Sequence, residues 1–262
     1  MLFDLYAPTE GWLHRLDPRT KLAMVLAGAA LLVAMDSAAA LGLVLLGVHL
    51  LLLSSRVPWR QIAWVWRQLA RVVIIIVAVW PLFARLPGPA LLAVGPLVVT
   101  LPSVLAGVAT ALRVVGMSLL FFVILFTTRQ DALVRGLVKL GLPFEAGLTL
   151  AIALRYIPTL THTVEQIQEA QAARGWQVER GDVLGRLRGM IPVFVALIIS
   201  VLRLSDTLGM ALAVRGVGSS QPRTVWRDIR FGPWDWLALT VTIAGAAGLL
   251  YARFAWGVGA GL

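Results

Sequence analysis

Cysteine is absent from the 262-residue sequence, and charged residues make up only 14% of it. The lack of thiols excludes disulfides, thiolate nucleophiles and zinc sites with cysteine ligands. His14, His49 and His162 are the only histidines, and they lack the i, i+4 spacing of helical metal ligands, so we expect no metal site. Lysine occurs only as Lys21 and Lys139, and neither lies in a Gly-x-x-x-x-Gly-Lys phosphate-binding loop. The chain therefore lacks this means of holding ATP.

Apolar residues dominate what is present. They make up 59% of the sequence, and the mean hydropathy is +0.86, well above that of soluble domains of this size. The sequence therefore predicts an integral membrane protein that is in contact with the lipid bilayer. A net charge of +10 could also indicate nucleic-acid binding, but that needs basic groups clustered with aromatic side chains on a surface facing water. We expect no nucleic-acid partner, because a membrane explains the basic residues better.

Five apolar runs approach the length of about 20 residues that a helix needs to cross about 30 Å of hydrocarbon. They cover residues 21–35, 38–55, 68–83, 104–126 and 234–256. The predicted fold class is an all-α integral membrane protein with about five transmembrane helices, plus long cytoplasmic or interfacial helices between the fourth and the fifth.

Basic residues predict the orientation, because they accumulate on the cytoplasmic side of a membrane. They precede the first apolar run and surround the connection from the second to the third, which predicts a cytoplasmic N-terminus in an inner membrane. Residues 86–103 carry no charge and are rich in proline and glycine, which favours an outward-facing loop or a re-entrant segment. Five spans would place the C-terminus outside.

The charges divide the chain into three segments. Residues 1–126 hold four apolar runs, residues 127–230 hold most of the charged residues, and residues 231–262 hold the last run. In the middle segment we expect a helix that is kinked at Pro158 and ends near Arg174. The apolar run 191–214 is long enough to be a sixth span. Because Arg203 and Asp206 lie within it, we interpret it as a helix that lies partly in the interface and descends into the cytoplasm.

Two helix ends in the middle segment share an Arg-Gly pair after small residues. Glycine suits the left-handed residue that closes a helix, and a cation balances the helix dipole, so a purely structural role is one interpretation. Docking is the other, because a slim helix tip that carries a planar guanidinium suits a socket on a partner. The candidate residues are Ala172, Ala173, Arg174 and Gly175 in the first end, and Ala213, Val214, Arg215 and Gly216 in the second.

Four stretches together resemble the transmembrane T component of energy-coupling factor transporters, the bacterial importers of vitamins and metal ions. They are "LHRLDPRTKL" at 13–22, "TTRQDALVRGLVKLGLP" at 127–143, "LRYIPTLTHTVEQIQEAQAARG" at 154–175 and "LRLSDTLGMALAVRG" at 202–216. The resemblance covers nearly the whole chain. It implies that the two Arg-Gly ends are coupling sites that sit in grooves of an ABC-type ATPase dimer and move a separate substrate-binding S component in the membrane.

The resemblance also implies a subunit that is not an enzyme and has no cofactor, with ATP bound by the partner ATPases. Val214 departs from the usual alanine of the family signature, which affects the tightness or equivalence of the second contact. Asp17, Pro18, Arg19 and Lys21 resemble an N-terminal family signature. They also form an ordinary helix start, with Asp17 as N-cap, Pro18 in the first turn and the two cations as cytoplasmic charges.

Two other functions compete with the coupling role. A self-sufficient transporter or channel could use Arg113, which lies near the middle of the fourth apolar run, together with the uncharged loop 86–103. The sequence leaves open whether Arg113 contacts another subunit or pairs within the bundle. A membrane enzyme has little support, because the apolar runs contain no cluster of His, Asp or Glu. The cargo and the identity of the ATPases are not encoded in recognisable residues.

Overall fold

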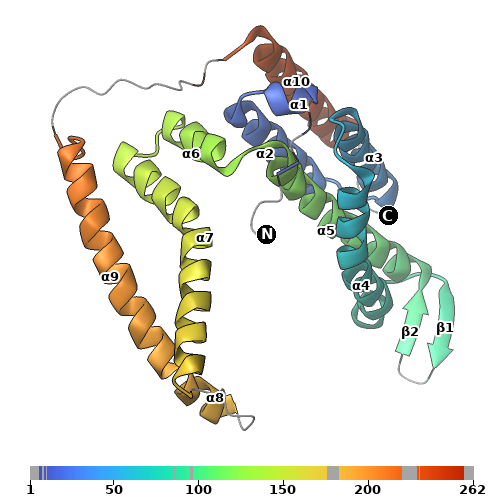
Figure 1. Ribbon diagram of the computed structural model, residues 1–262. Coiled ribbons are helices and arrows are strands. Elements are labelled where there is room, and N and C mark those ends of the chain that lie inside the picture. Colours follow the sequence, from blue (N-terminus) through green and yellow to red (C-terminus); the bar gives the residue numbers. More distant parts are fainter. Residues whose placement is uncertain are drawn as a thin grey trace. The chain divides into compact units, whose positions relative to one another are not determined.

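The computed structural model describes residues 6–7, 9, 11–84, 86–94, 97–175, 183–219, 229 and 231–256, and it is helical over most of them (Figure 1). The chain divides into two compact units. The first unit contains Met1–Gly147 and Ile229–Leu262, and the second contains Leu148–Asp228. The first unit therefore includes one further helix after the fourth apolar run. It also includes the end of the chain, which follows the second unit in the sequence.

The described part of the first unit contains seven helices. They are α1 (Trp12–Arg15), α2 (Pro18–Ala34), α3 (Ala38–Ser54), α4 (Trp59–Phe83), α5 (Leu101–Thr127), α6 (Gln130–Lys139) and α10 (Pro233–Trp256). Five of them (α2, α3, α4, α5 and α10) correspond to the five predicted apolar runs. Helix α4 begins at Trp59, well before the predicted residue 68. Its first turns are amphipathic, with Ile62 and Val65 buried while Arg60 is exposed, so a search for continuous apolar runs misses them.

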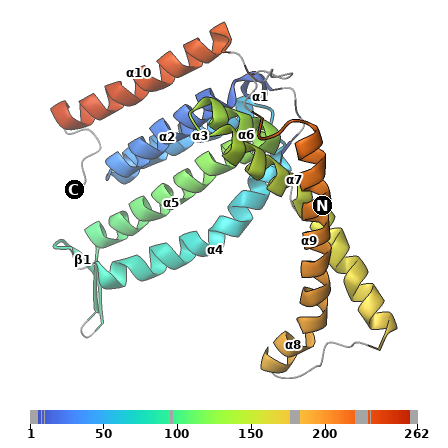
Figure 2. The same cartoon turned by 90° about the vertical axis from the view of Figure 1, so that its left-hand side faces the viewer.

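Helix α5 lies at the centre of the first unit. It packs against α2, α3 and α4, and α10 packs against the opposite side of α2 (Figure 2). The α5 side chains Leu119 and Phe126 are almost completely buried, together with Leu32 of α2 and Leu41 of α3. Because only α5 is surrounded by other helices along much of its length, it supplies more buried residues than any other described helix.

Helices α3 and α5 begin where polar side chains satisfy free backbone N–H groups. Ser37 accepts a hydrogen bond from the backbone N–H of Ala40 at the start of α3. Thr100 and Ser103 form a reciprocal capping box at the start of α5, with an Oγ–Oγ distance of 3.2 Å. These caps stop the helices from extending into the connecting turns.

The uncharged stretch 86–103 contains a hairpin. Strand β1 (Ala90–Val94) pairs antiparallel with β2 (Leu97–Thr100), and Ala90 lies opposite Thr100. Strand β2 runs directly into α5 and contacts both α4 and α5. The expected loop is thus ordered where it adjoins the helices, and Thr100 ends the strand and caps the helix.

The described part of the second unit contains three helices: α7 (Phe144–Ala173), whose first turn belongs to the first unit, α8 (Val183–Gly189) and α9 (Ile191–Val214). Helix α7 is continuous through Pro158. Helix α9 is long and apolar enough to cross a membrane, as are α4, α5 and α10. Arg203 and Asp206 of α9 are both exposed. The number of spans, the interfacial position of α9 and the predicted three-segment division stay predictions.

Candidate docking site at two helix ends

The first Arg-Gly pair closes helix α7. Gly175 has a φ of +84°, which is the left-handed conformation that glycine adopts without strain. Its N–H donates to the carbonyl of Ala172 at 3.0 Å, and the N–H of Arg174 donates to the carbonyl of Gln171 at 3.0 Å. Arg174 is thus the last residue before the chain turns, and Ala172, Ala173 and Arg174 are all exposed.

The second pair closes α9 with a complete Schellman motif. Gly216 has a φ of +72°, and its N–H donates to the carbonyl of Ala213 at 2.9 Å. The N–H of Val217 reaches back to the carbonyl of Leu212 at 3.0 Å. These two bonds satisfy carbonyls that a helix end otherwise leaves free. Arg215 stands at the C-cap, the same position that Arg174 occupies on α7.

Both tips present small or apolar side chains beside an exposed guanidinium. Ala213 is exposed. Val214 is 89% exposed, so it does not pack into the core of the described structure. Neither Arg174 nor Arg215 forms a side-chain ion pair with any residue that the structure describes. The two guanidiniums therefore have hydrogen-bond donors available for an external carboxylate or carbonyl.

Helices α7 and α9 run in opposite directions within the second unit (Figures 1 and 2). Their C-terminal ends therefore lie toward opposite ends of the unit. Because α9 has 24 residues, it is about 36 Å long. A single small socket is too narrow to receive both tips, whereas two separated sockets suit this arrangement.

The N-terminal signature residues lie in the first unit, where they start α2. Asp17 accepts hydrogen bonds from the backbone N–H and the Nε of Arg19, at 2.9 and 3.2 Å, and Pro18 occupies the first helical position. The Arg19 guanidinium lies 4.5 Å from the centre of the Phe231 ring, a cation–π distance. The predicted N-cap is confirmed, and Arg19 additionally contacts the segment that precedes α10.

Lys21 has a role that the sequence did not predict. The sequence indicated only a cytoplasmic charge at a helix start, and the structure shows that this charge is buried, with 2% exposure. Its Nζ donates to the carbonyl of Thr127 at 2.8 Å and to Thr128 Oγ1 at 3.3 Å. These acceptors compensate for the loss of water around the ammonium group. The side chain thus joins the start of α2 to the end of α5.

Arg113 pairs within the bundle, which answers one question that the sequence left open. Its Nε donates to the carbonyl of Leu32 at 2.9 Å, and its Nη2 donates to the carbonyl of Met35 at 2.7 Å and to Asp36 Oδ1 at 3.1 Å. Arg113 therefore caps the C-terminal end of α2. These bonds engage the guanidinium that the channel hypothesis requires for a substrate.

Two carboxylates that sequence reasoning missed hold these clusters together. Asp36 also accepts a 2.8 Å bond from Arg253, and this hydrogen bond, with the charges of Arg253 and Arg113, lowers the pKa of Asp36. Asp235 accepts bonds from the backbone N–H of Asp17 at 2.7 Å and from Gly232 at 2.9 Å. The only local signal for Asp235 was an acidic residue in a first helical turn after proline.

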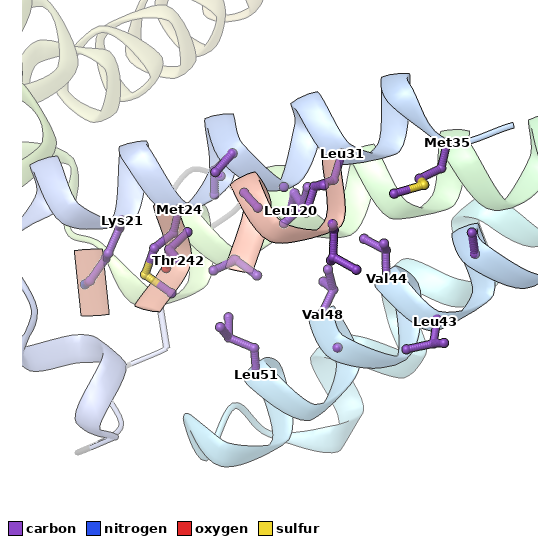
Figure 3. A pocket seen from close by; sticks show the side chains of 18 of the residues that line it. Lys21, Met24, Leu31, Met35, Leu43, Val44, Val48, Leu51, Leu120 and Thr242 are labelled. Carbon is purple, nitrogen blue, oxygen red and sulfur yellow. The ribbon is translucent and has the colours of Figure 1, made fainter. Parts of the chain in front are cut away.

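An apolar pocket of about 540 Å³ lies between α2, α3, α5 and α10. Lys21 and Met24 lie at one end of it, and Met35 and Leu43 lie toward the other (Figure 3). Its Thr242 hydroxyl already donates to the carbonyl of Ala238. The pocket thus offers an apolar contact surface. No group of three or more potential metal ligands occurs among the described residues.

Helices of this length and hydropathy define a multi-pass α-helical membrane protein. A family model described as "Cobalt transport protein" (CbiQ) matches residues 9–225. The chain is 31% identical to an energy-coupling factor transporter transmembrane protein of Acidaminococcus fermentans, over 98% of this chain and 99% of that protein. It is 29% identical to the protein of the same description from Bacillus subtilis, with coverage of 97% and 98%.

A third relative has a different description. A putative ABC transporter ATP-binding protein of Bifidobacterium longum is 30% identical over 93% of this chain, but the match covers only 32% of that protein. The chain belongs to the CbiQ family and is a transmembrane (T) component of an energy-coupling factor transporter.

Proposed function

We propose that this protein is the scaffold and energy-coupling subunit of an ATP-driven importer of vitamins or metal ions. In this proposal, the Arg-Gly ends of α7 and α9 dock into two ABC-type ATPase subunits. The observation that carries it is that Arg174 and Arg215 occupy the same exposed C-cap position, each followed by a left-handed glycine. Two equivalent tips on one chain match a partner that offers two equivalent sockets.

The Bifidobacterium relative supports an ATPase partner. It is described as ATP-binding, and the region similar to this chain makes up only about a third of it. The rest of that protein is long enough to hold separate nucleotide-binding domains. We infer that the present chain obtains the same function from separate subunits, that it binds no nucleotide or other cofactor, and that it catalyses no reaction.

The proposed mechanism uses α7 and α9 as rigid levers. Closure of the ATPase dimer on ATP would displace the two helix tips. A helix transmits such a displacement along its axis because its backbone hydrogen bonds run along that axis, although α7 lacks one of them at Pro158. The shaft of α9 exposes large apolar side chains, among them Phe194, Ile198 and Leu202. An apolar surface can slide against a membrane-embedded S component without breaking specific polar bonds.

The basic residues support an orientation with the N-terminus and both tips in the cytoplasm, where the ATPases and ATP are found. Arg56 and Arg60, in and just after the turn between α3 and α4, are exposed, as this orientation requires. The membrane would be the cytoplasmic membrane of a bacterium.

The first prediction concerns the two tips. Arg174→Glu combined with Arg215→Glu should abolish co-purification of the ATPases in detergent while the protein still inserts into the membrane. A reversed charge in a desolvated contact costs several kcal/mol, which corresponds to binding weakened by about 30-fold or more at each tip.

Arg203→Glu is the matched control, because Arg203 is an exposed arginine on the same helix, away from its tip. It should retain the ATPases. Full retention of the ATPases by the double variant would refute the docking proposal. If the chain reconstituted alone showed ATP-independent flux that Arg113→Ala abolishes, the channel hypothesis would replace it.

A further inference from the structure

The second unit is inserted into the first, so the chain crosses between them twice. It leaves the first unit after Gly147 and re-enters it at Ile229. The segments on the first-unit side of these crossings are the end of α5 with α6, and the start of α10. Both segments contact the first turn of α2, residues Asp17–Lys21, which we call the anchor turn.

On the return side, Asp235 joins α10 to the anchor turn. Its Oδ1 accepts from the backbone N–H of Asp17 at 2.7 Å and from Thr20 Oγ1 at 3.1 Å. Its Oδ2 accepts from the N–H of Gly232 at 2.9 Å, just before α10 begins. Asp235 is 5% exposed and Thr20 is fully buried, so water does not compete for these bonds.

On the departure side, Lys21 joins the anchor turn to the end of α5. Its ammonium group binds the carbonyl of Thr127 and the hydroxyl of Thr128, immediately before the chain enters α6. Asp17 and Asp235 interact electrostatically with the same ammonium group. The two sides are therefore linked through one buried cluster in which opposite charges compensate one another.

Close packing extends the departure-side connection to α7. A Cβ at Gly136 of α6 would lie 2.9 Å from Pro18 Cβ, so α6 lies directly against the anchor turn. A Cβ at Gly147 would overlap Val138 Cγ2, so the first turn of α7 lies directly against α6. Neither interface has space for a side chain, and this leaves little slack between Pro18 and the start of α7.

We propose that the anchor turn is the fixed point against which the second unit moves, with Lys21 and Asp235 as its positioning residues. This rests on the coupling function proposed above. A lever produces displacement only if its attachment is held, and here one buried turn binds the first-unit segments at both crossings. Without it, movement of the tips would be absorbed at the two crossings and would not reach the S component.

The test uses the complete complex of this chain, the ATPases and an S component, reconstituted in vesicles. Lys21→Met removes the bonds from the anchor turn to the end of α5. Asp235→Asn weakens the bonds between the anchor turn and α10, because it places an amide where a carboxylate accepts three hydrogen bonds. For each variant, the number of ATP molecules hydrolysed per substrate molecule imported is measured. We expect it to rise about five-fold or more, the scale of a typical coupling free energy, while the ATPases remain bound.

Thr20→Val is a milder variant in case the charge substitutions prevent folding, since it removes one bond to Asp235 at nearly constant volume. Thr240→Val is its matched control, because that exposed threonine of α10 donates only to carbonyls of its own helix. Thr20→Val should raise the ATP cost of import, and Thr240→Val should leave it unchanged.

A merely structural role predicts a different result: fewer complexes recovered, but an unchanged number of ATP molecules per import event in those that assemble. That outcome would overturn the anchor proposal. It is distinguishable from failure of the docking proposal, in which the Arg174→Glu, Arg215→Glu variant keeps its ATPases whatever happens at the anchor turn.

Discussion

Asp36 shows how a single residue can join three helices at one end of a bundle. One carboxylate oxygen binds Arg113 of α5 at 3.1 Å, and the other binds Arg253 of α10 at 2.8 Å. Arg113 additionally binds carbonyls at the C-terminal end of α2. Three helices thus meet at the turn between α2 and α3 through one acid and two bases.

This cluster predicts a dependence of stability on pH. The folded-state pKa of Asp36 is lowered by its hydrogen bond with Arg253, so its stabilising contribution is present above the unfolded-state pKa of about 4 and is lost as the pH falls through the lower, folded value. Asp36→Asn should therefore lower the Tm in detergent at neutral pH, and the difference from wild type should shrink below about pH 4.

The wild-type protein and the variant should be compared by thermal unfolding over that pH range. Asp206→Asn is a suitable control, because Asp206 is an exposed acid for which no ion pair occurs among the described residues. A Tm difference between wild type and Asp36→Asn that stays constant down to the most acid conditions would contradict the assignment.

Among the elements, α7 and α9 are notable for ending in the same manner. At Gly175 nothing lies within 4 Å of a built Cβ, and at Gly216 only Ser219 Oγ does, at 3.7 Å. Steric crowding therefore does not require glycine at either position. The positive φ does, since other residues pay a conformational cost there.

We predict that Gly216→Ala weakens ATPase retention by altering the end of α9. The left-handed conformation should cost alanine about 1–2 kcal/mol, which favours a different path for the chain after Arg215. Gly209→Ala is the matched control: Gly209 lies inside the same helix with open space around it, and alanine there should stabilise the helix by about 0.5–1 kcal/mol.

Pull-down measures retention of the ATPases, and the helical circular dichroism signal during thermal unfolding measures helix stability. Together they separate an effect on docking from an effect on stability. Equal ATPase retention by both glycine variants would show that the geometry of the helix end does not matter for docking.

The sequence predicted those elements whose signals are local. Arg-Gly after alanines predicted the ends of α7 and α9, and Asp17-Pro18 predicted the start of α2, because caps depend on neighbouring residues. Asp235 binds a residue 218 positions away, and Lys21 binds one 106 positions away. Those partners are set by the packing of α2 against α5 and α10, which no local pattern encodes.

At the scale of the whole molecule, the two units differ in how their polar groups are used. The first unit pairs ionic side chains at both ends of α2: those of Asp17, Lys21 and Asp235 at the anchor turn are buried, and Arg113 and Arg253 bind the exposed Asp36 at the other end. The described second unit instead exposes its basic helix ends and much of the apolar surface of α9. Such a distribution suits a stationary body that carries an extended surface for other chains.

This contrast predicts a protease footprint. Trypsin should cut the isolated protein after Arg174 and Arg215, because both follow the last helical residue and are exposed. Bound ATPases should slow both cleavages, by about 100-fold at a free ATPase concentration about 100 times Kd. Peptides that end at each arginine can be quantified by mass spectrometry.

Arg56, exposed in the turn between α3 and α4, provides a reference cleavage site that should be unaffected. Protection of only one of the two arginines would indicate a single socket, whereas protection of neither would place the ATPases elsewhere on the chain.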